Sequence, residues 1–162
     1  MDAQSGSDVP NGVELRVAPA IGVAQVGQGR RLKAAPDWVG ATARVELTVT
    51  DADTAQAVGS GDVPVLATPR VLALVEAASV AATTTRLPPG TTTVGTRVDL
   101  EHRAATAVGR TVVAEARLAK TEGRRLGFEV VVLDAGQVVA EGRLERVLVD
   151  RHTFVERAFG SP

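Results

Sequence analysis

The chain has 162 residues, the size of one ordinary domain, and its 18 Lys and Arg nearly balance its 19 Asp and Glu, giving a formal charge of −1. Such a chain lacks the basic field that holds a nucleic acid, and the absence of cysteine excludes disulfide frameworks, thiolate metal sites and cysteine nucleophiles. Apolar residues make up 44% of the sequence but aromatic residues only 2%, so the core must consist mainly of Val, Leu and Ala.

The first 40 residues mix Gly, Pro and polar side chains with valines that follow no period, which predicts a loosely ordered extension. The opening sequence MDAQSGSDVP is acidic and polar where a secretory signal is basic and then apolar, and no apolar run approaches membrane-spanning length. We therefore expect a cytoplasmic protein without a membrane partner. Its expected parts are the extension at 1–40, one domain at 41–158 and a tail at 159–162.

The domain begins with a strand, in which apolar residues alternate with polar ones from Ala41 to Val49. Residues 51–61 are rich in Ala, Gly, Ser and Asp, which predicts a loop or a short lid helix. A long buried helix is predicted at 69–85, because this segment is rich in Ala and Leu and two prolines follow it. Thr68 is then expected at the N-cap and Pro69 at the first helical position.

Four strand-like runs follow the helix, and short connections that contain glycine separate them. They cover residues 92–102, 110–120, 124–134 and 137–150. The last two connections are typical of hairpins, so the last three strands should form an antiparallel meander. One apolar helix beside a curved antiparallel sheet is an α+β arrangement in which the sheet wraps around the helix, and this is the outline of a hot-dog fold.

Glu76 is the only ionisable residue between Arg70 and Arg86, in the predicted helix. A buried carboxylate is costly unless it is paired or hydrogen-bonded, and no other charge marks a solvent-exposed face of this helix. We therefore favour a functional role for Glu76 over the alternative of a surface residue on an amphipathic helix.

His102 is one of only two histidines, and the alternation that starts at Val94 places it on the apolar face at the end of a strand. An imidazole there can reach a cleft, or it can be a core histidine satisfied by a backbone carbonyl. The other histidine, His152, lies in the polar stretch DRHTF and is expected on the surface.

Two further polar residues have an ordinary and a functional interpretation. Thr68 needs no explanation beyond capping, although its hydroxyl and the free N–H groups of a helix start can also face a substrate carbonyl. Arg146 follows the parity of Val138 and Leu144, so its guanidinium falls on the apolar side of the last strand and must find a partner. That partner is either Glu76, in a structural ion pair, or a ligand.

Several sequence blocks occur in a specific order: LAT, an apolar helix with one Glu, VGTRVDLEHRAATAVG, EGRRLGFEV and AEGRLER. In this order they resemble the fluoroacetyl-CoA thioesterase-like family of hot-dog acyl-CoA thioesterases, over residues 41–155. The resemblance implies hydrolysis of an acyl-CoA thioester to a carboxylate and CoA. The implied site residues are catalytic Thr68, Glu76 and His102 and substrate-binding Gly95 and Arg146.

As a hypothesis for the mechanism, we assign Glu76 as base or nucleophile, His102 as the acid that protonates the CoA sulfur, and Thr68 as the group that orients Glu76 or the attacked carbonyl. Thr68 and Glu76 would lie about 12 Å apart along one helix, so we expect a homodimer with sites near its interface. Family members selective for fluoroacetyl groups have an aromatic-rich lid, whereas AQAVGSGDVPVLAT before the helix has no aromatic residue, so we do not expect that selectivity.

Other functions remain open at this point. The main alternative is a non-catalytic hot-dog module that binds acyl-CoA or a protein partner, because a fold does not establish an activity. A hydratase or dehydratase would need an Asp/His pair, but Asp99 lies on the strand face opposite His102. Motifs for nucleotides, zinc proteases and α/β-hydrolases are absent, so we expect no cofactor and no metal.

Overall fold

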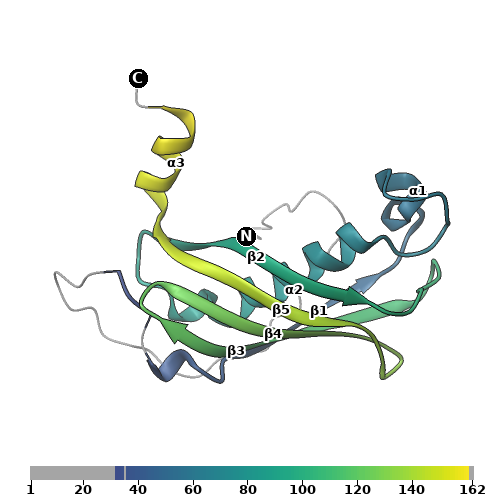
Figure 1. Cartoon of the computed structure of the whole chain (residues 1–162), viewed down its shortest axis with the longest axis horizontal. Coiled ribbons are helices and arrows are strands. Elements are labelled where there is room, and N and C mark those ends of the chain that lie inside the picture. The colour runs from purple at the N-terminus through teal and green to yellow at the C-terminus, as the bar shows by residue number, and fades with distance from the viewer. Residues whose placement is uncertain (1–31, 35, 161–162) are drawn as a thin grey trace, which may run out of the picture.

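The computed structural model describes residues 32–34 and 36–160, and Figure 1 shows one long helix along a face of a curved sheet. The strands are β1 (Thr42–Thr48), β2 (Thr91–His102), β3 (Thr111–Glu122), β4 (Arg125–Asp134) and β5 (Gln137–Asp150). The helices are α1 (Ala55–Val58), α2 (Thr68–Thr83) and α3 (Arg151–Phe159), with short 3-10 turns at Pro36–Trp38, Asp51–Asp53 and Thr84–Arg86.

The strands follow the spatial order β1-β3-β4-β5-β2, and all neighbouring strands are antiparallel. Tight turns connect β3 to β4 and β4 to β5, so the predicted meander is confirmed. β2 follows α2 in the chain and joins the far edge of the sheet, beside β5. The α+β hot-dog arrangement predicted from the sequence is therefore confirmed.

α2 packs on the sheet, mainly on β1 and β3, through a stripe of residues three or four positions apart, as the helical period requires. The buried residues of this helix are Val71, Leu74, Val75, Ala78, Ser79, Ala82 and Thr83. Opposite them, Ala114 and Ala116 of β3 are also buried, and their small side chains let the helix approach the sheet closely. The core is aliphatic apart from Trp38 and Phe128, as the composition predicts.

The start of α2 differs from the prediction. Ala67 is the N-cap residue, with extended backbone angles, and its carbonyl accepts hydrogen bonds from the amides of Arg70 and Val71. Thr68 is therefore the first helical residue and Pro69 the second. The prediction of Thr68 as the N-cap is wrong, because the helix begins one residue earlier than expected. The N-cap is Ala67, and no side chain caps the helix. The Thr68 hydroxyl is thus free for another partner.

A β-bulge in β2, between Gly95 and Arg97, changes which side chains face α2. Gly95 and His102 are seven positions apart and would face opposite sides of a regular strand. The extra residue at the bulge turns both toward α2, where Gly95 adjoins Glu76 and His102 contacts Thr68. The single alternation predicted to start at Val94 is wrong, although His102 does face the helix.

A second register shift, between β4 and β5, lies at Val132 and Leu133. Val139 and Ala140 are consequently both buried, while Val138 is 43% exposed. The predicted parity of β5 is therefore wrong at Val138, but it correctly places Arg146 on the buried side.

The two ends of the described chain lie outside the strands and differ in how they pack. Ala34 and Trp38 are buried in the core, and the Ala34 amide donates to the carbonyl of Gly123 in the β3–β4 turn. Residues 1–31 of the predicted extension lie outside the described residues. At the other end, α3 projects from β5 (Figure 1). Its side chains Phe154 and Phe159 are exposed. No helix in the described ranges is long and apolar enough to cross a membrane.

Candidate active site

Thr68 and His102 form the first of two polar groups on α2. Thr68 Oγ1 lies 2.9 Å from His102 Nδ1. The two residues come together because the segments beside them are joined: the Leu66 amide donates to the Thr106 carbonyl at 2.9 Å, and Val65 and Ala107 form an antiparallel bridge. The start of the helix and the end of β2 are thus fixed to each other by backbone hydrogen bonds.

The environment of His102 favours its neutral form. Burial lowers the pKa of the imidazole, and the backbone of Ala104 offsets only part of this effect. Nε2 is inaccessible to solvent and makes no hydrogen bond within the described residues. A neutral imidazole with its proton on Nε2 leaves Nδ1 as an acceptor, so Nδ1 can take the proton of the Thr68 hydroxyl.

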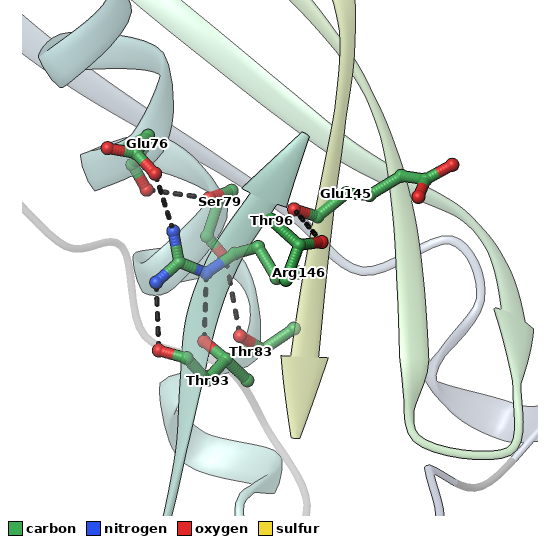
Figure 2. A network of polar contacts seen from close by, with 7 residues as sticks. All are labelled: Glu76, Ser79, Thr83, Thr93, Thr96, Glu145 and Arg146. Carbon is green, nitrogen blue, oxygen red and sulfur yellow. Dashed lines mark hydrogen bonds and ion pairs between the residues drawn. The ribbon is translucent and has the colours of Figure 1, made fainter. Parts of the chain in front are cut away.

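Glu76, Gly95 and Arg146 form the second polar group, which Figure 2 shows in part. Glu76 Oε1 lies 3.3 Å from Arg146 Nη1, and the side chains are 36% and 7% exposed, respectively. A Cβ atom on Gly95 would overlap Oε1, so only glycine leaves room for the carboxylate at this point of β2. Of the two partners expected for Arg146, Glu76 is the one present in the structure.

Arg146 is held rigidly by β2. Its Nε donates to Thr93 Oγ1 and its Nη2 to the Thr93 carbonyl, both at 2.9 Å (Figure 2). Burial lowers the pKa of the guanidinium and the charge of Glu76 opposes this effect, so Arg146 stays a cation. A fixed cation then neutralises and orients the Glu76 carboxylate.

The two groups lie on the same helix but do not touch. Thr68 and Glu76 are eight residues apart, which is about 12 Å along α2 at 1.5 Å per residue. The hydroxyl of Thr68 contacts His102 and not Glu76, so the predicted orientation of Glu76 by Thr68 does not occur within one chain. The five predicted site residues therefore form two groups, Thr68 with His102 and Glu76 with Gly95 and Arg146.

The remaining ionisable residues named in the sequence lie elsewhere. His152 is 83% exposed and pairs with Glu156 on α3, as expected for a surface residue. Asp99 is exposed on the outer face of β2, away from His102. Within residues 32–34 and 36–160, no three His, Cys, Asp or Glu side chains are close enough to hold a metal ion.

Sequence reasoning missed two residues next to the site, Asp53 and Thr93. Both are buried, and each accepts hydrogen bonds from an arginine. Asp53 lies in a segment with loop composition, where an aspartate looks solvated. The available signal was the spacing of Thr50 and Asp53, which matches a capping box. Nothing in the sequence indicated that Thr93 is buried, because the bulge that changes which residues of β2 face the helix cannot be recognised from the sequence.

The sheet, the central helix and the polar groups along it define a hot-dog protein with a candidate catalytic site. A family model described as "Fluoroacetyl-CoA-specific thioesterase" matches residues 49–152. The chain belongs to this family, as the resemblance in the sequence predicted.

Individual relatives agree with the family. The fluoroacetyl-CoA thioesterase of Streptantibioticus cattleyicolor is 37% identical over 90 residues, which span 56% of this chain and 65% of that protein, just under two thirds of its length. A structure of the fluoroacetyl-CoA thioesterase FlK superposes with a TM-score of 0.70 at 28% identity, covering 83% of this chain and all of that one.

Two other solved structures extend this comparison. A variant of FlK in complex with fluoroacetate and CoA gives a TM-score of 0.67 at 30% identity, covering 72% of this chain and 98% of that chain. A thioesterase superfamily member from Thermus thermophilus gives 0.69 at 31% identity, covering 75% and 89% of the two chains. The hot-dog fold is thus shared with FlK and with a thioesterase superfamily member whose name states no acyl group.

Proposed function

We propose that the protein hydrolyses an acyl-CoA thioester to a free carboxylate and CoA. Membership of a thioesterase family supports the reaction class, and the CoA bound in a related structure supports the substrate class. The contact between Thr68 Oγ1 and His102 Nδ1 is the observation that carries the assignment to this site. It pairs a hydroxyl with a neutral imidazole, an arrangement that activates a nucleophile.

In this proposal His102 acts first as a base and then as an acid. Its lowered pKa leaves it neutral at neutral pH, so it can accept a proton from the Thr68 hydroxyl or from a water that this hydroxyl positions. The imidazolium then gives the proton to the CoA sulfur as the carbon–sulfur bond breaks. In the water route the tetrahedral intermediate breaks down to CoA thiol and a carboxylic acid, which loses its proton to solvent. In the hydroxyl route the thiol leaves first and Thr68 carries the acyl group as an ester; His102 then activates a water that hydrolyses this ester to the carboxylate and restores the hydroxyl.

The tetrahedral oxyanion needs a hydrogen-bond donor, and the start of α2 supplies one. Pro69 has no N–H, and the amides of Arg70 and Val71 already donate to Ala67. The Thr68 amide makes no hydrogen bond within the described residues, so it is available to an oxyanion beside its own side chain. The Gly95 amide is the second proposed donor.

Glu76 and Arg146 complete the proposed site. Glu76 Oε2 makes no hydrogen bond within the described part of the chain, and it can accept one from an attacking water. Arg146 lies 3.3 Å from the other oxygen of this carboxylate and holds it in place. Gly95 lets the acyl group and the carboxylate approach the backbone closely.

We propose that the protein is a homodimer whose subunits share each site. Two observations support this: β2 is an edge strand with one unpaired side, and the exposed face of α2 is apolar at Ala73 and Val80. A second subunit would cover both and bring its own Glu76 toward Thr68 and His102, which one chain separates by about 12 Å. A cytoplasmic location remains part of the proposal and is tested by cell fractionation.

The acyl group is proposed to be aliphatic and not fluoroacetyl. Residues 51–67, which precede α2, include no aromatic side chain, and the core beneath the helix is mainly Val, Leu and Ala, with Trp38 and Phe128 as its aromatic members. A segment of this composition offers dispersion contacts to a short or branched aliphatic chain but no aromatic ring to a fluoromethyl group.

The test of the reaction is release of free thiol from a panel of acyl-CoAs, including acetyl, isobutyryl, hexanoyl, phenylacetyl and fluoroacetyl thioesters. We expect hydrolysis of aliphatic members with no preference for fluoroacetyl-CoA. If none of the panel yields thiol while acyl-CoA still binds in calorimetry, the protein is the non-catalytic binding module and the proposal fails.

A further inference from the structure

Asp53 is a buried carboxylate that the proposed chemistry does not use. It ends the short 3-10 turn after β1 and is 4% exposed. Its Oδ2 accepts hydrogen bonds from the Thr50 amide and hydroxyl at 2.8 and 2.9 Å. Its Oδ1 accepts from Arg70 Nε at 2.7 Å and lies 2.6 Å from Arg70 Nη2. A buried carboxylate is costly unless it is paired and hydrogen-bonded, and the contacts with Thr50 and Arg70 meet both conditions.

The backbone of Asp53 reaches the start of α2 as well. Its carbonyl accepts the amide of Ala67, the N-cap residue, at 2.9 Å. Its carboxylate holds the side chain of Arg70, three residues further along the helix. Asp53 therefore binds the start of α2 at two residues, Ala67 and Arg70, which lie on either side of Thr68.

These contacts of Asp53 take the place of a side-chain N-cap, which the helix lacks. Ala67 has no side chain that can accept a hydrogen bond from the first turn, and no side-chain cap is present. A negative charge near a helix N-terminus also interacts favourably with the helix dipole. Burial raises the pKa of Asp53, but Thr50 and Arg70 lower it more, so the pKa lies below its ordinary value and the group is charged at neutral pH.

We infer that Asp53 and Arg70 are positioning residues, which hold the first turn of α2 so that the Thr68 hydroxyl stays within reach of His102 Nδ1. This inference rests on the proposed function for its effect on catalysis. The Thr68 side chain is exposed, and within the described residues its only hydrogen bond is the one with His102. Without the ion pair only the backbone hydrogen bonds at Leu66 and Ala67 would hold this end of the helix, so the first turn, which carries Thr68, would be less firmly held. A displacement of about 1 Å at a reacting group costs on the order of 100-fold in rate.

The test compares Asp53→Asn, Arg70→Gln and Arg70→Lys with a control pair on the outer face of the sheet. Asn keeps the shape of Asp53, but its NH2 group cannot accept a hydrogen bond, so the hydrogen bonds with either Thr50 or Arg70 are lost. Arg44 and Glu115, 2.7 Å apart and far more exposed, form the matched control, tested as Glu115→Gln. Because Asp53→Asn removes several buried hydrogen bonds, Arg70→Gln is the milder variant if Asp53→Asn fails to fold.

Two readouts separate the inference from the proposed function. The first is steady-state hydrolysis of the best acyl-CoA, where we expect kcat to fall on the order of 10- to 100-fold with KM changed less than about threefold, and Arg70→Lys to recover part of the loss. The second is the histidine NMR spectrum, which needs no activity. His102 signals should shift in Asp53→Asn and Arg70→Gln, with those of His152 as an internal reference.

A shift of the His102 signals without any wild-type hydrolysis supports the positioning role and overturns the proposed function. Unchanged His102 signals and unchanged kcat in a folded Arg70→Gln variant overturn the positioning role. An equal loss of kcat in Glu115→Gln would also overturn it, because the effect would then follow from any lost ion pair.

Discussion

Thr68 Oγ1 and His102 Nδ1 lie 2.9 Å apart, although the two residues are 34 positions apart in the chain. One is the first residue of the central helix and the other the last residue of an edge strand. A hydrogen bond between such ends depends on the register of the whole sheet. The bulge at Gly95 sets that register, so the contact and the shape of β2 are tied together.

Gly95→Ala tests the packing of the second polar group. The new Cβ would overlap Glu76 Oε1 and push the carboxylate from Arg146. We expect hydrolysis to fall on the order of 100-fold with little change in thermal stability, since only the end of a partly exposed side chain must move. Gly142→Ala is the contrast, because its Cβ would overlap the backbone of Asp99 and should cost about 1–3 kcal/mol of unfolding free energy.

Arg146→Met tests whether the buried guanidinium also supports the fold. The substitution leaves the Thr93 carbonyl and Glu76 without their donor. We expect urea unfolding to show a loss of about 2–4 kcal/mol. Arg143→Met, on the exposed face of the same strand, should change stability by less than about 0.5 kcal/mol. Equal losses for the two variants would contradict a specific role of Arg146.

The lowered pKa of His102 gives a pH dependence with a defined sign. The unfolded chain binds a proton below about 6.5, the ordinary value, while the folded chain binds it only at lower pH. Stability from this group is therefore complete above 6.5 and declines as pH falls toward the folded pKa. We expect the hydrolysis rate to rise through that same lower pKa, as required of a base. An NMR titration of His102 with a midpoint above 6.5 would refute this.

Mixed dimers test the shared site. Glu76→Ala and His102→Ala variants, each inactive alone, are unfolded together and refolded as a mixture. If each site takes Glu76 from one subunit and His102 from the other, half of the dimers carry one intact site, and about a quarter of the wild-type activity should return. No recovery from a mixture that light scattering shows to be dimeric would place each site within one chain.

The fold and the unusual residues could be predicted from the sequence, and the contact of Arg146 with Glu76 was one of two alternatives, whereas the contact of Thr68 with His102 could not be predicted. Glu76 and His102 stand out because a lone charge and a lone imidazole in apolar segments need an explanation. The pairing of Thr68 with His102 escaped because it depends on a bulge and on a helix start fixed by the backbone of Ala67. Asp53 was not predicted for a related reason: its hydrogen bonds come from Thr50 and Arg70, and the sequence alone does not show that these residues lie together.

A double-mutant cycle on Thr68 and His102 measures the central claim most directly. Thr68→Ala, His102→Ala and the double variant are compared with wild type by thiol release from the preferred acyl-CoA. If the two side chains act as one unit, each single variant should lose on the order of 100-fold or more in kcat, and the double variant should be no worse than the poorer single one. Losses that multiply, or a Thr68→Ala variant with wild-type kcat, would contradict the account.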